Sequence, residues 1–222
     1  MSRLLSPRTG PPRNVRLLRT GPEVFRPPAY LPRVRIVAFA DEPPPVDAAE
    51  LVEANAPDAV VTLGDLRPDW IASLGGLDVP RLGVHGNHDA PGDLAASGVR
   101  DLHRARVEAG GWSFAGFEGC VRYGNGPHQY TQDEAAELVS WLPRADVLVC
   151  HCPPLGINDE PDDPAHAGFR GLREWVGRHH PRYVLHGHTT PDPRTRVHRV
   201  GATEVVWVRG FRVVELTRRT SS

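Results

Sequence analysis

Short apolar runs recur along this chain, and several stop abruptly at polar residues. Runs of this length that are rich in β-branched residues are typical of buried strands. Side chains at neighbouring strand ends can meet at one point, and Asp, Asn and His are metal ligands. We therefore expect a site where these runs end. The runs and the polar residues after them are 34–40 with Asp41, 59–63 with Gly64 and Asp65, 80–84 with residues 85–89, 146–150 with His151, and 183–185 with Gly187 and His188.

Helix-type spacing fills the intervals between the first runs. Residues 46–56 show it, with Asp47 as the N-cap and Glu50 three residues later, in the position of a capping box. Strands that alternate with helices favour parallel pairing with right-handed crossovers. Further helices are expected over residues 69–74, over 131–141 with Thr131 and Glu134 as a second capping box, and over 168–179.

The centre and the end of the chain have a different pattern. Short runs broken by glycine are typical of antiparallel strands. They are followed by two loops, the glycine-rich residues 123–130 and the acidic, proline-rich residues 155–167. The predicted antiparallel strands are residues 99–102, 105–108, 112–117, 197–200, 203–208 and 211–216.

Composition divides the chain into two parts. Residues 1–33 are rich in Pro and Arg and predict an extended arm with a short edge strand at 14–19, whereas residues 34–222 predict one α/β domain. The net charge of −1 gives no global field for nucleic acid or membrane. All 26 cationic residues are Arg, so an arginine is by itself weak evidence for anion binding.

Three cysteines, an odd number, favour a reducing compartment. The sequence shows no signal-peptide pattern and no stretch long enough to span a membrane, so we expect a cytoplasmic protein without a membrane partner. Cys150 and Cys152 flank His151 and suggest a soft-metal site as one alternative. Strand alternation instead puts both thiols on the face opposite His151, and two buried thiols are the favoured interpretation.

The strand-end residues, taken as a set, resemble the calcineurin-like metallophosphoesterase superfamily. The resemblance covers residues 34–216 and depends on Gly64-Asp65, on Gly-Asn-His-Asp at 86–89, and on Gly187-His188. It implies an α/β fold, a four-layer α/β/β/α sandwich of two mixed β-sheets flanked by helices. It also implies metal-activated water that attacks phosphorus.

The resemblance assigns a role to each strand-end residue. In the family two metals share a bridging Asp, which corresponds to Asp65. Oxygen and nitrogen ligands of this kind suit Mn²⁺, Fe²⁺ or Zn²⁺. The implied metal ligands are Asp65, Asn87, His151 and His188, and the implied catalytic residues are His88 at the leaving oxygen, Asp89 orienting His88, and Asp41 from the second metal site.

Two family histidines are missing. The family's Asp-x-His motif here has Pro43 in place of His, and its Gly-His-x-His motif has Thr190. Both missing histidines would bind the metal that Asp41 serves. We therefore predict one divalent transition metal ion, with Mn favoured over Fe or Zn, and a second metal site that is absent or weak.

Four residues are candidates to compensate for the missing ligands. Arg67 could hold phosphate with a fixed positive charge and His128 could reach the site from the glycine-rich loop, so both are substrate-binding candidates. For Arg67, an exposed turn residue before Pro68 is the stronger interpretation. Glu42 and His166 are weighed as replacement ligands. Strand alternation turns His85 away from the metal, and surface positions are expected for His103, His179, His180 and His198.

The predicted function is hydrolysis of a phosphate ester, with a phosphodiester favoured over a monoester, by metal-activated water at a one-metal variant of a normally two-metal site. The alternative is a catalytically degenerate scaffold of the same fold that binds a partner. Nucleic acid is expected only as a substrate, and the sequence predicts no oligomeric state.

Overall fold

In the computed structural model, which describes residues 33–218, alternate side chains of strand β1 (Val34–Ala40) enter two apolar cores. Ile36 and Ala38 belong to the core between the two main sheets. Val37 and Phe39 belong to a core beneath the neighbouring helices. Burying a side chain the size of Ile36 or Phe39 contributes about 1.5–3 kcal/mol, so both faces of β1 hold layers together.

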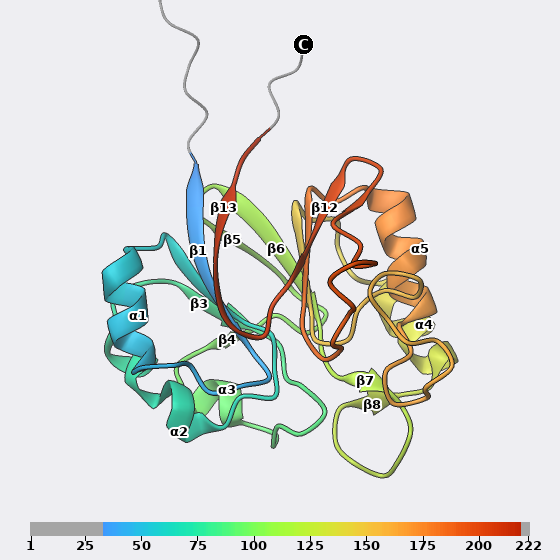
Figure 1. Ribbon diagram of the computed structural model, residues 1–222, viewed down its shortest axis with the longest axis horizontal. Helices are drawn as coiled ribbons and strands as arrows, with labels where there is room; N and C mark the ends of the chain where they lie inside the picture. Colours follow the sequence, from blue (N-terminus) through green and yellow to red (C-terminus); the bar gives the residue numbers. More distant parts are fainter. Residues whose placement is uncertain (1–32, 219–222) are drawn as a thin grey trace, which may run out of the picture. The chain divides into compact units, whose positions relative to one another are not determined.

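Two mixed sheets form the middle of the structure (Figure 1). A small third sheet pairs β7 (Cys120–Val121) with β8 (Gln129–Tyr130). The first main sheet has the order β13 (Gly210–Leu216), β1, β2 (Ala59–Thr62), β3 (Arg81–Gly83) and β4 (Arg100–Asp101). The second has the order β11 (Arg199–Val200), β12 (Thr203–Trp207), β10 (Tyr183–His186), β9 (Val147–Cys150), β6 (Trp112–Phe117) and β5 (Arg106–Ala109).

Helices cover the outer face of each main sheet (Figure 1). One apolar core joins the first sheet to its helices, and another joins the second sheet to α4 and α5. The predicted four-layer α/β/β/α sandwich is therefore confirmed. The helices are α1 (Ala48–Asn55), α2 (Pro68–Ile71), the 3₁₀ turn η1 (Ala72–Gly76), α3 (Asp93–Ala96), α4 (Gln132–Ser140) and α5 (Arg170–His179). None of the helices within residues 33–218 is long and apolar enough to cross a bilayer.

Helix starts follow the capping residues. Thr131 and Glu134 form the predicted capping box at α4. The carboxylate of Asp47 accepts from the backbone N–H groups of Ala49 and Glu50, so α1 begins at Ala48 and not at residue 46. Helix α5 begins at Arg170, two residues later than predicted, because Phe169 still bridges to Pro154 as extended chain.

Some pairing predictions are wrong. Strand β4 runs parallel to β3, and β12 runs parallel to β10, although antiparallel strands were expected in both regions. The β5–β6, β11–β12 and β1–β13 pairs are antiparallel as expected. Local glycine-broken patterns do not reveal which distant strand a segment will join. The predicted arm at 1–33, with its edge strand, lies outside the described residues except for Arg33.

Parallel pairing brings the carboxyl ends of several strands to one edge. Strands β1, β2 and β3 are parallel in the first sheet, and β9 and β10 are parallel in the second. Trp207 of β12 pairs with His186, and Gly210 of β13 pairs with Ala40, so the turn between them crosses from one sheet to the other at this edge. The predicted strand-end residues lie here.

Candidate metal centre

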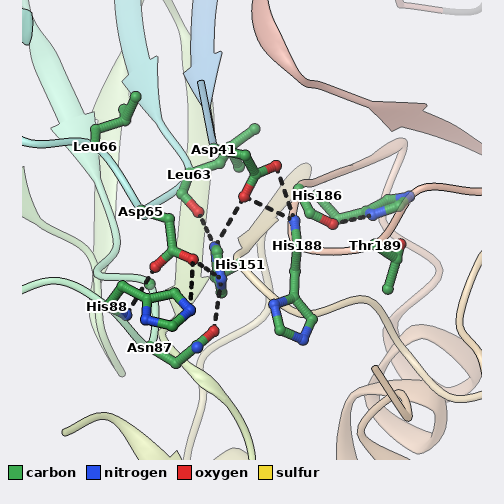
Figure 2. A network of polar contacts seen from close by, with 12 residues as sticks. Asp41, Leu63, Asp65, Leu66, Asn87, His88, His151, His186, His188 and Thr189 are labelled. Atoms are coloured by element: carbon green, nitrogen blue, oxygen red, sulfur yellow. Dashed lines mark hydrogen bonds and ion pairs between the residues drawn. The ribbon is translucent and has the colours of Figure 1, made fainter. Parts of the chain in front are cut away.

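Three strand-end residues have a left-handed backbone conformation that is uncommon for residues with side chains. Asp41, Asp65 and His188 have φ angles of 62°, 54° and 66°. Such backbone strain costs free energy and collects at functional sites. It turns these side chains toward a common point, where His151 lies at the centre of a polar network (Figure 2).

Two glycines allow the loops after β2 and β3 to touch. A Cβ atom on Gly64, which has a φ of 91°, would lie 2.2 Å from the backbone nitrogen of Gly86. A Cβ atom on Gly86 would lie 2.0 Å from Oδ1 of Asp65. Only glycine fits such close backbone contact. The Gly-Asp and Gly-Asn pairs are therefore required by the contact between the two loops.

Asp89 fastens these loops to each other. Its Oδ2 accepts from the backbone N–H groups of Gly86 at 2.7 Å and Asp65 at 3.0 Å. Its Oδ1 accepts from the N–H of Leu66 at 3.1 Å. Asp89 is only 6% exposed. The sequence assigned it to orient the His88 side chain, whereas the structure places its carboxylate on the backbone around Asp65.

Asp89→Asn is expected to destabilise the fold. The substitution keeps the volume but points an N–H₂ group at a backbone donor, and hydrogen bonds to a charged group contribute about 1.5–3 kcal/mol each. The free energy of unfolding in urea should fall by about 2–3 kcal/mol. The control is Asp78→Asn at an exposed position, which should change it by less than about 0.5 kcal/mol. Equal stability of Asp89→Asn and wild type would contradict this role.

His151 is fully buried and has its two nitrogens in different surroundings. Nδ1 lies 2.7 Å from the carbonyl oxygen of Leu63, which requires a proton on Nδ1. Nε2 faces two oxygens, Oδ1 of Asn87 at 3.1 Å and Oδ2 of Asp65 at 3.4 Å. A nitrogen between two oxygens needs a proton or a metal ion. The carbonyl of Leu63 thus acts as the partner that fixes the tautomer of a metal-binding histidine.

The charges of Asp65 and His151 agree with this arrangement. Burial opposes ionisation of Asp65, but the charge and hydrogen bond of His151 outweigh burial and lower the pKa of Asp65. Burial likewise opposes the charge on His151, but Asp65 outweighs it and raises the pKa of His151. The protein therefore creates a negative field at Nε2, where a cation is stabilised.

His188 supplies a second nitrogen. Its Nε2 lies 2.7 Å from the carbonyl oxygen of Ala165, so Nε2 carries the proton and Nδ1 keeps its lone pair. Burial, with a further contribution from the charge of His151, lowers the pKa of His188 to about 3. His188 is therefore neutral at pH 7, as a metal ligand must be.

These donors fit one divalent transition metal ion. Ligand atoms of Asp65, His151 and His188 all lie within 4.8 Å of one another. The His151 and His188 rings are 4.8 Å apart and inclined at 56°, so their planes intersect and can share an ion. The amide oxygen of Asn87 faces the same point, and two oxygens with two nitrogens suit Mn²⁺, Fe²⁺ or Zn²⁺. The structure thus brings the four predicted ligands together.

Asp41 and His88 border this centre. The carboxylate of Asp41 accepts from the backbone N–H of His188 and lies 4.0 Å from Nδ1 of His151. Burial raises the pKa of Asp41 to about 6, although His151 opposes the shift. The side chain of His88 is 71% exposed, with Nε2 3.9 Å from Oδ2 of Asp65. One titratable group therefore lies inside the site and another lies at its opening.

The candidate compensating residues lie elsewhere or act indirectly. Arg67 is exposed and bound through two nitrogens to Asp69, so it does not reach the site. His128 contacts Glu118. Glu42 pairs with Arg209. The His166 ring lies 5.2 Å from that of His188, and its Nδ1 contacts Asp163.

A second buried cluster surrounds Glu118. Its carboxylate contacts Nδ1 of His85 at 3.0 Å, Nδ1 of His128 at 3.1 Å and Nε2 of His103 at 3.7 Å, and it accepts from the hydroxyl of Tyr130. His85 is turned away from the metal centre, as predicted. The prediction of a surface position for His103 is wrong, because its ring packs between Phe117 and Tyr130.

The Glu118 cluster does not have the geometry of a metal site. The rings of His85 and His128 are stacked 4.5 Å apart and inclined by only 3°. A metal lies in the plane of the imidazole that binds it, and parallel stacked planes share no such point. We interpret the cluster as an ion-pair clamp that fixes the glycine-rich loop.

Sequence reasoning missed two residues beside the centre. The hydroxyl of Tyr123 accepts from Nδ2 of Asn87 at 3.1 Å, which leaves the amide oxygen of Asn87 facing the centre. The carbonyl of Ala165 orients His188. An exposed aromatic residue on a glycine-rich loop was the only sequence signal for Tyr123, and a backbone carbonyl gives none.

Cys120, Cys150 and Cys152 are buried and unbridged. Burial raises the pKa of Cys150 and Cys152 well above that of a free thiol, so both are neutral. This agrees with the expectation of buried thiols over a soft-metal site.

Comparisons with known proteins connect this geometry to a fold. No family model and no curated protein matches the sequence. One solved crystal structure matches with a TM-score of 0.61 at 17% identity, covering 82% of this chain and 95% of its own. The protein TT1561 of Thermus thermophilus, which has a small calcineurin-like phosphoesterase fold, matches with a TM-score of 0.53 at 18% identity, covering 78% of this chain and 88% of its own. At these identities the likeness concerns the fold, and this chain has a metallophosphoesterase-like fold with a candidate metal-binding cluster at its strand ends.

Proposed function

We propose that this protein is a metal-dependent phosphoric ester hydrolase, with phosphodiesters as preferred substrates and one metal ion at its centre. The observation that carries the proposal is the convergence of donor atoms from Asp65, Asn87, His151 and His188. A bound ion of this class polarises a phosphoryl oxygen and lowers the pKa of water. Mn²⁺ is favoured, and Fe²⁺ or Zn²⁺ also suits the donors.

The residues around the centre supply the proton transfers. Asp41, with its pKa raised to about 6, can accept a proton from attacking water near neutral pH. His88 lies at the exposed side of Asp65, and its backbone N–H donates to Oδ1 of Asp65 at 2.9 Å. This bond fixes the start of the side chain while leaving the imidazole accessible, so His88 is placed to protonate or stabilise the leaving oxygen.

The test is a screen of aryl phosphate diesters and monoesters with and without added Mn²⁺. Hydrolysis should depend on Mn²⁺ and favour the diester. His88→Asn should lower kcat by about 10²–10⁴-fold, the usual contribution of a general acid, while Mn²⁺ affinity stays near that of wild type. The matched control is His198→Asn at an exposed position.

Three outcomes would contradict the proposal. Full activity in Asn87→Ala would assign the hydrolysis to a contaminant. Hydrolysis without any metal dependence would exclude the proposed chemistry. Tight Mn²⁺ binding with no hydrolysis of any ester would favour the alternative, a catalytically degenerate scaffold that binds a partner.

A further inference from the structure

Arg209 lies in the turn that crosses between the two main sheets. The preceding residue, Val208, donates its backbone N–H to the carbonyl of His186, and the following residue, Gly210, pairs with Ala40. His186 lies two residues before His188, and Ala40 directly precedes Asp41. The backbone of Arg209 is therefore fixed from both sides at the edge that carries the metal centre.

The side chain of Arg209 joins two strand-end segments. Its Nε donates to Oε1 of Glu42 at 2.7 Å, and its Nη1 donates to Oγ1 of Thr190. Glu42 follows Asp41, and Thr190 lies two residues after His188. The positive charge of Arg209 also acts on Asp41, where it opposes the rise in pKa that burial causes. A guanidinium thus stands beside the residues that would have served a second metal.

Arg209 retains binding capacity toward solvent. A guanidinium has five N–H donors, and the bonds to Glu42 and Thr190 use two of them. Its side chain is 40% exposed. Thr190 also lines a cleft of about 480 Å³, together with Glu160 and Asp192. A ligand in this cleft would lie next to the residue that Arg209 already contacts.

We propose that Arg209 binds the phosphate group of the substrate and supplies the fixed positive charge that a second metal ion would otherwise provide. A planar guanidinium can hold two phosphate oxygens in parallel. Glu42 and Thr190 hold it in position, and the cleft beside Thr190 receives part of the ester. This inference rests on the proposed function, because it names the second phosphate-binding element of the same site.

Arg67 provides a matched comparison. Both arginines pair with an acidic neighbour, but Arg67 pairs through two nitrogens with Asp69 and packs over Trp70. None of these contacts reaches a residue of the metal centre. The sequence favoured Arg67 as the compensating cation, and the contacts assign that role to Arg209.

The experiment measures binding of inorganic phosphate by calorimetry, with and without Mn²⁺, in wild type, Arg209→Gln, Arg209→Lys and Arg67→Gln. Arg209→Gln should weaken phosphate binding by about 10- to 100-fold, the loss expected for one or two charge-assisted hydrogen bonds. Arg209→Lys should recover part of it, because it keeps the charge without the planar fork. Arg67→Gln should bind phosphate as wild type does, and Mn²⁺ affinity should change less than about three-fold in every variant.

Unchanged phosphate affinity in Arg209→Gln would overturn the inference, as would an equal loss in Arg67→Gln. Failure of the proposed function is distinguishable, because it appears in the wild type as hydrolysis that does not depend on Mn²⁺. The Arg209 effect is also measured in metal-free protein, where it should persist, since none of the four proposed metal ligands is changed.

Discussion

Asp65→Asn is expected to weaken Mn²⁺ binding more than about 100-fold, beyond the loss usual for residues that only orient a ligand. The amide keeps an oxygen for the backbone N–H of His88, so the loop can retain its shape. It removes the negative charge that raises the pKa of His151, and it places an N–H₂ group where an anionic oxygen faced Nε2. Hydrolysis should fall with metal occupancy.

Calorimetry with Mn²⁺ measures this loss, and circular dichroism shows whether the variant is folded. Asp69→Asn is the control, because Asp69 lies four residues further along and pairs with exposed Arg67. Tight Mn²⁺ binding by a folded Asp65→Asn variant would remove Asp65 from the ligand set.

Glu118→Gln is expected to cause the largest loss of stability. Glu118 is 7% exposed, and His85, His128 and Tyr130 converge on its carboxylate. Removing one partner of a buried ion pair costs about 3–5 kcal/mol. Gln keeps one acceptor oxygen, so a loss of about 3 kcal/mol in the free energy of unfolding is expected at pH 5.5. Glu137→Gln, on the exposed face of α4, should change it by less than about 0.5 kcal/mol.

The difference between wild type and Glu118→Gln should depend on pH. Burial opposes ionisation of Glu118, but His128 and His85 hold its pKa below the ordinary value of 4.5, so its stabilisation is lost as the pH falls below 4.5. Burial opposes charge on His85, but Glu118 raises its pKa above 6.5, so that stabilisation is lost as the pH rises further. The difference should be largest between about pH 4.5 and 6.5. A difference that is flat from pH 3 to 9 would contradict the ion-pair clamp.

The metal centre was predictable from sequence because its ligands are local. Asp65, Asn87 and His151 each follow a buried strand directly or within a few residues, and parallel strands bring their ends to one edge. The four layers followed from the same alternation of strands and helices. The uncertain boundaries were decided by single interactions, such as the Asp47 cap at α1.

The Glu118 cluster could not be predicted in this way. His85, His103, Glu118 and His128 lie on separate segments, and nothing in their spacing joins them. The contact of Arg209 with Glu42 spans 167 residues and depends on a turn between sheets whose pairing was predicted only in part. Asp89 was assigned to a side chain because backbone N–H groups leave no mark in a sequence. Interactions across sheets therefore needed the fold.

The most direct test of the central claim is a crystal structure of the Mn²⁺-loaded protein with anomalous diffraction from the metal. We predict one Mn²⁺ per chain, bound by Asp65, Asn87, His151 and His188, with the guanidinium of Arg209 on the side of Asp41. Two ions about 3.5–4 Å apart, or a single ion at Glu118, would contradict this account.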